Sequence, residues 1–548
     1  MLNDYFCSVF TNDNNILPNF TVPKVDNEKL SLESTLFSEY IVSQKIKKLK
    51  NNCSPGYDGF TAIPLKKLND VIAKPLSMLF NISMETGMLP SSWKLSIITP
   101  IFKKGDKSSA NNYRPISLTS IVCKLMESVI KDVMLSYLDK NNLLYSKQYG
   151  FMPKKSTNAQ LLRYFNDISS AVLDGCQVDS VYLDYSKAFD SIVHTKLLFK
   201  LEKYGIGEKL LMWLSAFLLD RQQTVKVSNG YSDWSPVLSG VPQGSVLGPI
   251  LFIIYINDLS TSCPDLHTLY LFADDAKCFA SIRSSADSIL FQKSLDSISN
   301  WSNLWQLNLA ADKCQIITFS YHKDPLTFNY FVNNIPLIRV DEILDLGVRF
   351  SHDLSFSPHI KDVCNRARRK ASIILNCFKS KNKNILFKAF ISFVRPLLDY
   401  CSNLWSPFKK TEIDLIESVQ KRFTKRLNGL KELHYSERLK VLDTESLEKR
   451  RLKSDLSMYY KIIFQMVDLP VEAFFCFRDG IKRNNGLCIY SKSFRSNAER
   501  YYFRNRCVNS WNLLPQNVVN APSLFSFKRG LANFDLHKYL RTSHDYPP

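Results

Sequence analysis

Short apolar runs that end on polar residues predict the main elements of this chain. Leu269 to Phe272 lead into Asp274 and Asp275, and Cys278 to Ala280 resume the apolar pattern, which predicts a hairpin with two adjacent carboxylates at its tip. Val181 to Leu183 form a similar run that ends on Asp184. Apolar positions at helical spacing predict helices over residues 121–138, 194–204, 285–305 and 360–378. Strands at residues 180–184, 269–273 and 314–319, set among such helices, predict an α+β fold with antiparallel strands backed by helices.

The carboxylates of Asp274 and Asp275 are costly without a counter-charge. Like charges a few Å apart raise each other's pKa, and burial adds a desolvation cost, unless a divalent cation compensates for both. Oxygen ligands at this density suit Mg²⁺ or Mn²⁺. For this tetrapeptide alone, a polar β-turn rich in Asp is the alternative. If the strand that ends on Asp184 lies beside the hairpin, the three side chains predict a two-metal site for phosphoryl transfer.

A loop rich in Gly and Pro lies between these Asp segments. Residues 239–249 read SGVPQGSVLGP and precede the apolar run from Ile250 to Ile256. Gly240 and Gly244 would let a backbone approach a ligand closely, and Pro249 suits the first turn of a helix. By itself such a loop is a weak indication, but its place between Asp184 and Asp274 makes it a strong one.

In this order the three segments resemble motifs A, B and C of reverse transcriptases, in the form found in non-LTR retrotransposons of the jockey type. Further segments that resemble motifs of this family follow its order, at residues 98–106, 112–118, 148–157, 307–314 and 346–360. The resemblance implies a right-hand polymerase with fingers, palm and thumb, an antiparallel palm sheet, and a mainly helical basic C-terminal region. The expected division is an N-terminal extension or linker at 1–80, fingers and palm at 85–352, the thumb at 353–430, and the C-terminal region at 431–548.

The same resemblance implies the catalytic roles. Asp184 and Asp274 would be the principal ligands of two Mg²⁺ or Mn²⁺ ions, with Asp275 as a further ligand or supporting carboxylate and the Tyr185 carbonyl completing the shell. Lys313 is a candidate general acid for pyrophosphate, although an exposed structural Lys after a turn fits the residues equally well.

Other residues would bind the nucleotide. Phe189 follows Asp184 by five residues, where an aromatic ring in the family excludes a ribose 2′-hydroxyl; a core Phe is the alternative. Arg suits bidentate phosphate contact, whereas Lys acts as a point charge. The expected nucleotide-binding residues are Lys103, Lys104, Arg114, Phe189, Gln243 and Gly244.

Positive charge is concentrated after the catalytic motifs. Residues 1–350 carry 35 basic and 33 acidic side chains, net +2, whereas residues 351–548 carry 36 and 18, net +18. Basic residues of the helix at 360–378 predict a surface that grips template and primer phosphates, a solvated helix face being the alternative. The expected nucleic-acid-binding residues are Gln148, Lys154, Lys155, Arg366, Arg368, Arg369 and Lys370.

Composition fits a globular protein inside the cell. The 548 residues are 45% hydrophobic and 22% charged, and the 13 cysteines are scattered without a Cys-x-x-Cys pair, which fits a reducing compartment and argues against a zinc finger. The longest apolar run is too short for a bilayer, so no membrane partner is expected. We expect synthesis in the cytoplasm and action in the nucleus during integration.

The sequence therefore predicts an RNA-directed DNA polymerase that copies element RNA into DNA by target-primed synthesis. Its expected partners are the element RNA template, a DNA or RNA primer with a 3′-hydroxyl, dNTPs, and an upstream endonuclease domain missing from this chain. A catalytically silent RNA-binding protein descended from such an element is the competing hypothesis, and a maturase-like splicing cofactor is a more remote one.

Overall fold

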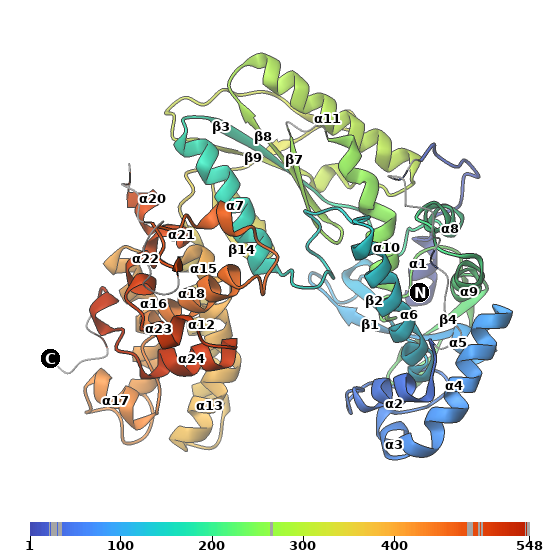
Figure 1. Cartoon of the computed structure of the whole chain (residues 1–548), viewed down its shortest axis with the longest axis horizontal. Coiled ribbons are helices and arrows are strands. Elements are labelled where there is room, and N and C mark those ends of the chain that lie inside the picture. The colour runs from blue at the N-terminus through green and yellow to red at the C-terminus, as the bar shows by residue number, and fades with distance from the viewer. Residues whose placement is uncertain are drawn as a thin grey trace.

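The computed structural model of this chain describes residues 1–20, 22, 30, 36–263, 267–478, 486–490, 494, 497–542 and 544. Figure 1 shows a central sheet beneath α11 (Ser285–Leu304), with the N-terminal region on one side and a mainly helical C-terminal region on the other. The mixture of sheets and helices confirms the predicted α+β class.

The central sheet has the strand order β12-β9-β3-β8-β7. β3 pairs antiparallel with both β8 and β9. Along β3, Val181 and Leu183 pack in one hydrophobic core and Val178 packs in another, so both faces of the sheet are covered. Burial on both faces explains why these strands read as continuous apolar runs. The strands are β3 (Gln177–Leu183), β7 (Thr268–Phe272), β8 (Asp275–Ile282), β9 (Gln315–Phe319) and β12 (Ile338–Arg339).

A second sheet lies in the N-terminal region, with the order β2-β1-β4-β5 and with β6 also paired to β4. The first helix, α1 (Leu2–Ser8), packs against this sheet, because Phe6 joins Ile98 and Val225 in a small core. The opening residues are therefore part of the folded N-terminal region. The strands are β1 (Leu95–Phe102), β2 (Tyr113–Leu118), β4 (Arg221–Val227), β5 (Gly230–Tyr231) and β6 (Ser235–Val237).

Helices cover both sheets. Those predicted from apolar spacing are confirmed as α6 (Ile121–Lys140), α8 (His194–Lys203), α11 and α12 (Ser357–Cys377). The others up to residue 256 are α2 (Glu39–Lys47), α3 (Ala62–Lys67), α4 (Asn69–Thr86), α5 (Ser91–Lys94), α7 (Thr157–Leu173), α9 (Glu208–Leu218) and α10 (Gly248–Ile256).

Two short hairpins lead into the C-terminal helices. They are β10 (Phe331–Val332) with β11 (Ile335–Pro336), and β13 (Glu342–Asp345) with β14 (Val348–Ser351). The helices after α12 are α13 (Lys383–Phe393), α14 (Arg395–Asp399), α15 (Ser402–Trp405), α16 (Lys410–Lys425), α17 (Tyr435–Val441), α18 (Leu447–Ile463), α19 (Val471–Phe474), α20 (Asn497–Tyr501), α21 (Phe503–Arg506), α22 (Val508–Asn512), α23 (Gln516–Val519) and α24 (Leu524–Asn533).

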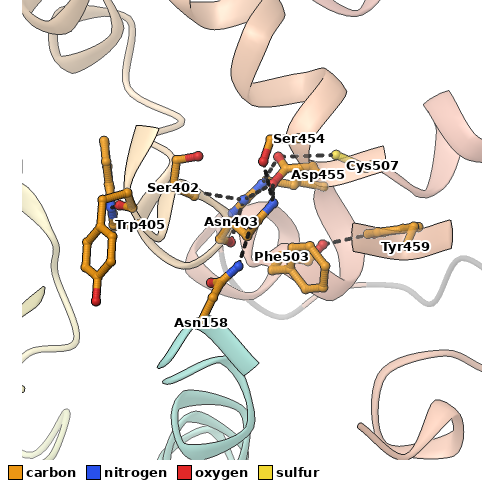
Figure 2. Close-up of polar contacts among 11 residues, drawn as sticks. Asn158, Ser402, Asn403, Trp405, Ser454, Asp455, Tyr459, Phe503 and Cys507 are labelled. Carbon is orange, nitrogen blue, oxygen red and sulfur yellow. Dashed lines mark hydrogen bonds and ion pairs between the residues drawn. The ribbon is translucent and has the colours of Figure 1, made fainter. Parts of the chain in front are cut away.

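A buried polar network joins the C-terminal helices to the helix that backs the central sheet. Asn403 lies between Asn158 of α7 and Asp455 of α18 (Figure 2), with its Oδ1 accepting from Asn158 at 2.8 Å and its Nδ2 donating to Asp455 at 3.0 Å. Arg506 of α21 forms an ion pair with Asp455 at 2.8 Å. These contacts join segments as far apart as Asn158 and Arg506 into one packed region.

Among the described residues, no helix combines the length and the hydropathy that crossing a membrane requires.

Candidate active site

The β7–β8 hairpin carries the paired carboxylates. Its last pair is Phe272 with Asp275, so Ala273 and Asp274 form the turn, as the sequence predicts. On the neighbouring strand Leu183 pairs with Ala276, which brings Asp184, the next residue, beside the hairpin tip. Asp184 and Asp275 are exposed, and Asp274 is half-buried. Three carboxylates from two distant segments therefore meet at one end of the central sheet.

The carboxyl groups at this end of the central sheet have raised pKa values. Burial raises the pKa of Asp274, and the charge of Asp184 raises it further. Although Asp275 is exposed as a residue, desolvation by the surrounding protein raises the pKa of its carboxyl to about 6, with additional effects from Asp274, Asp345 and Asp184. These shifts have the sign expected of carboxylates whose mutual repulsion a cation would relieve.

The donor set fits a divalent cation that is only partly held by protein. In the part of the chain that the structure describes, no three His, Cys, Asp or Glu side chains converge into a ready metal cage. Mg²⁺ is commonly held by one or two carboxylates together with substrate phosphates, and such a site needs no protein-only cage. The exposed oxygens of Asp184 and Asp275 suit that shared coordination.

Two cations of the N-terminal sheet lie near the carboxylates. Arg114 and Lys103 both lower the pKa of Asp274, which places their charges close to the hairpin tip. They stand on adjoining parts of the β1–β2 hairpin, where Ile101 pairs with Arg114 and the Lys103 N–H donates to the Asn112 carbonyl at 2.7 Å. Lys104 is also exposed in this hairpin. The arrangement can bind a polyphosphate next to the carboxylates.

The Phe189 ring packs against the protein core on one face and is partly exposed to solvent on the other. Its ring stacks on Phe252 of α10, with centroids 4.4 Å apart and planes at 15°, and Phe151 approaches it at 6.3 Å. The side chain is half-buried. A ring held against the core on one side and partly open on the other can act as a steric wall.

The Gly-rich loop approaches protein backbone in this structure. A Cβ on Gly240 would lie 2.7 Å from the Asp190 Cα, and one on Gly244 would lie 2.4 Å from the Ser117 carbonyl oxygen. Both glycines also have positive φ angles, +86° and +135°. The close approach expected toward a ligand is therefore made toward the segment after Asp184 and toward β2.

Gln243 fixes this loop to the same segment. Its Nε2 donates to both oxygens of Asp190, at 2.8 and 3.0 Å, and its carbonyl accepts from the Ser117 N–H at 2.8 Å. Burial raises the pKa of Asp190 to about 6, while the bonds from Gln243 oppose that rise. Gln243 thus connects the loop, β2 and the Asp184 segment.

Lys313 lies close to Asp184. The Ala310 N–H donates to the Asp184 carbonyl at 2.8 Å, and the Ser186 N–H donates to the Asn308 carbonyl at 2.9 Å. These bonds do not use the Tyr185 carbonyl. Lys313 follows in a short 3-10 helix and is exposed. The structure therefore brings Lys313 to the same end of the central sheet as the carboxylates.

Two expected nucleic-acid contacts are directed inward instead. Gln148 is 1% exposed, and its Oε1 accepts from the Gly150 and Ala273 N–H groups. The Lys155 side chain is 8% exposed and pairs with Asp468 at 3.1 Å. Polar character alone does not distinguish a buried bonding group from a surface contact, and contact of these two residues with nucleic acid stays a prediction that their burial does not favour. Lys154 is exposed, as expected.

The basic residues of α12 differ among themselves. Arg366 is exposed but pairs with Asp362 at 2.9 Å. Arg368 is half-buried and donates to the Ser418 hydroxyl at 3.0 Å, which connects α12 to α16. Arg369 and Lys370 are exposed. Arg369 and Lys370 are therefore better placed than Arg368 to meet phosphates.

Sequence reasoning missed three buried charged residues. Glu127 of α6 is fully buried, and its Oε2 accepts from the Val246 and Leu247 N–H groups at 2.7 and 3.0 Å, at the start of α10. Lys277 of β8, two residues after Asp275, forms a buried ion pair with Asp345 of the β13–β14 hairpin. No local signal marks them, because Glu and Lys are ordinarily exposed.

Comparison with known proteins agrees with this geometry. Residues 101–350 match the family model described as "Reverse transcriptase (RNA-dependent DNA polymerase)". These residues are therefore similar to a reverse transcriptase domain, which confirms the resemblance of the motifs.

The relatives are proteins of mobile elements. The chain is 28% identical over 401 residues to the "RNA-directed DNA polymerase from mobile element jockey" of Drosophila melanogaster, covering 71% of this chain and 43% of that protein. It is 28% identical over 401 residues to the "Probable RNA-directed DNA polymerase from transposon BS" of the same fly, covering 70% and 43%, and 27% identical over 411 residues to that from transposon X-element, covering 73% and 45%. The chain thus spans less than half the length of these relatives.

Proposed function

We propose that this chain is an RNA-directed DNA polymerase of a non-LTR retrotransposon that extends a 3′-hydroxyl primer on an element RNA. The observation that carries the proposal is the meeting of Asp184 with Asp274 and Asp275, beside the charges of Arg114 and Lys103. Paired carboxylates opposite phosphate-binding cations are what nucleotidyl transfer requires, since its catalysis is mostly positioning and charge stabilisation.

In this proposal the regions take the roles of a right hand. The N-terminal sheet and its helices are the fingers, the central sheet is the palm, and α12 to α16 are the thumb, followed by the basic C-terminal region. Template and primer would lie across the palm, with Lys154, Arg369 and Lys370 available for phosphates. Element RNA, a DNA or RNA primer and dNTPs are the proposed partners, together with an upstream endonuclease for target-primed synthesis in the nucleus.

The residues of the site would divide the work. Two Mg²⁺ or Mn²⁺ ions, when bound, would supply the charge that activates the 3′-hydroxyl and stabilises the leaving pyrophosphate. Asp184 and Asp274 would hold them, helped by Asp275 and the Tyr185 carbonyl. Arg114 with Lys103 and Lys104 would orient the triphosphate, and Lys313 would give a proton to the leaving pyrophosphate.

The nucleotide pocket would be shaped by Phe189 and the Gly-rich loop. Phe189 would exclude a 2′-hydroxyl. Gln243 and Gly244 would set the position of the loop that forms the floor of the nucleotide and template site.

Primer extension on purified protein, with an RNA template, a DNA primer, dNTPs and Mg²⁺, tests the proposal. Asp274→Asn should lower the extension rate by about a hundredfold or more, because a few kcal/mol of transition-state stabilisation are lost with the ligand charge. Asp296→Asn, an exposed Asp on α11, is the matched control and should extend normally. Primer-template affinity should be unchanged in both. Near-normal extension by Asp274→Asn would contradict the two-metal assignment, and binding without any extension by the wild type would favour the silent RNA-binding protein.

A further inference from the structure

A short segment before α7 lies along the outer edge of the catalytic hairpin. The Tyr149 N–H donates to the Leu271 carbonyl at 2.8 Å, and the Leu271 N–H donates to the Lys147 carbonyl at 3.1 Å, so residues 147–149 pair in parallel with β7. β7 is the last strand in the order of the central sheet. The segment therefore covers the open edge of the strand that leads into Asp274.

The side chain of Gln148 continues this pairing past the end of the strand. Its Oε1 accepts from the Gly150 N–H at 2.8 Å and from the Ala273 N–H at 3.0 Å. Its Nε2 is buried and finds no hydrogen-bond partner among the described residues. The opposite orientation of the amide would place an NH₂ group against two N–H donors, so the acceptor role of the oxygen is fixed by its neighbours.

The backbone that Gln148 holds is in an unfavourable conformation. Ala273 has a φ of +56°, in the left-handed region that residues with a Cβ rarely adopt. Gly150 is packed against the same residue, since a Cβ on Gly150 would lie 2.4 Å from the Ala273 nitrogen. Such a turn persists only where its surroundings determine it. Residues 148–150 supply these surroundings, through one accepted hydrogen bond and one close packing contact.

We propose that Gln148 is a positioning residue that, with Gly150, holds the Ala273 turn and thereby sets the places of Asp274 and Asp275. The consequence for catalysis rests on the proposed polymerase function, whereas the effect on the turn does not. Gln148 acts through the backbone of its neighbour and touches neither nucleotide nor template.

Three substitutions separate this role from others. Gln148→Met keeps the length of the side chain but removes the acceptor, and leaves two buried N–H groups without a partner. Gln148→Glu keeps an acceptor oxygen at the same place, replaces the unbonded Nε2 by a second oxygen, and adds a negative charge that the two N–H donors face directly. Gln160→Met, at an equally buried glutamine of α7, is the matched control for losing a buried amide.

Amide hydrogen exchange of peptides covering residues 269–276 gives a readout that does not depend on activity. Gln148→Met should accelerate exchange there by about tenfold or more, while Gln148→Glu and Gln160→Met stay near the wild-type rate. Gly150→Ala should accelerate exchange in the same peptides, because it displaces Ala273 directly, and it serves as the second variant if Gln148→Met does not fold.

Primer extension then tests the consequence for the carboxylates. Gln148→Met should raise the Mg²⁺ concentration for half-maximal extension and lower kcat by about tenfold or more, with the Kd for primer-template unchanged. A weakened Kd in Gln148→Glu with unchanged exchange in Gln148→Met would overturn the inference and return Gln148 to a nucleic-acid contact. If the wild type shows no extension, the proposed function fails, while the exchange comparison still decides the role of Gln148.

Discussion

Replacing Phe189 by Val should admit ribonucleotides. Phe189→Val shortens a half-buried ring that lies five residues after Asp184, so space opens on the side away from Phe252. Overpacking a well-fitted site by one group costs about 1–3 kcal/mol, and relieving it should improve the kcat/KM of a ribonucleotide relative to its deoxy counterpart by about 5- to 160-fold.

The same substitution also lowers the stability of the fold, and this effect must be separated from the exclusion of the ribose 2′-hydroxyl by the Phe189 ring, which we call the gate. Loss of the stack on Phe252 and of part of the ring should lower stability by about 1–2 kcal/mol, less than for a fully buried Phe. This cost falls on both nucleotide types together. Only the ratio of the two efficiencies therefore reports the gate.

The assay is single-nucleotide insertion with CTP and dCTP on one primer-template, combined with a thermal melt. Phe217→Leu, at a buried ring of α9 that stacks on Trp213 and not on Phe189, is the control and should lower the melting temperature without changing the ratio. A Phe189→Val variant with a lowered melting temperature and an unchanged ratio would refute the gate and leave Phe189 as a packing residue.

Two further predictions concern the basic face of α12 and the buried carboxylate of α6. Arg369→Ala and Lys370→Ala should each reduce the slope of primer-template affinity against salt by about 0.7–0.9. Arg368→Ala should instead leave the slope unchanged and lower the melting temperature, because Arg368 bonds to Ser418. An equal change of slope in all three variants would contradict this separation of phosphate contacts from packing contacts. Glu127→Ala should destabilise the protein by about 2–4 kcal/mol in a denaturant melt, since two buried N–H groups at the start of α10 lose their acceptor, and a change within 0.5 kcal/mol, typical of neutral surface sites, would contradict that role.

The local pattern of apolar and polar residues predicts the strands of the central sheet and the hairpin that carries Asp274 and Asp275. The apolar runs before Asp184 and Asp274 form strands, and the interruption by two Asp residues marks the tip of a hairpin. These features depend on neighbours in sequence, which is the information that periodicity carries. The loop at 239–249 was also recognisable, since its Gly and Pro residues constrain the backbone whatever packs against it.

Contacts across long separations could not be predicted in the same way. Gln148 and Ala273 are 125 residues apart, and nothing near Gln148 indicates that its oxygen accepts from a turn of another strand. The parallel pairing of β1 with β4 and the packing of Phe6 on that sheet depend likewise on the whole topology. Buried Glu127 and Lys277 resemble surface residues in the sequence, because burial is decided by partners that the sequence does not place.

The contacts between α7 and the C-terminal helices imply that the two regions unfold together. Beyond the Asn158–Asn403 bond, the Tyr502 hydroxyl donates to the Leu162 carbonyl at 3.1 Å, and the rings of Tyr502 and Phe165 lie 4.9 Å apart. α7 also packs on the central sheet, through the core that contains Tyr164 and Tyr270. Proteolytic removal of the last hundred residues would therefore uncover the apolar side of the helix that supports the carboxylate-bearing strands, and the trimmed protein would lose cooperative melting and tend to aggregate.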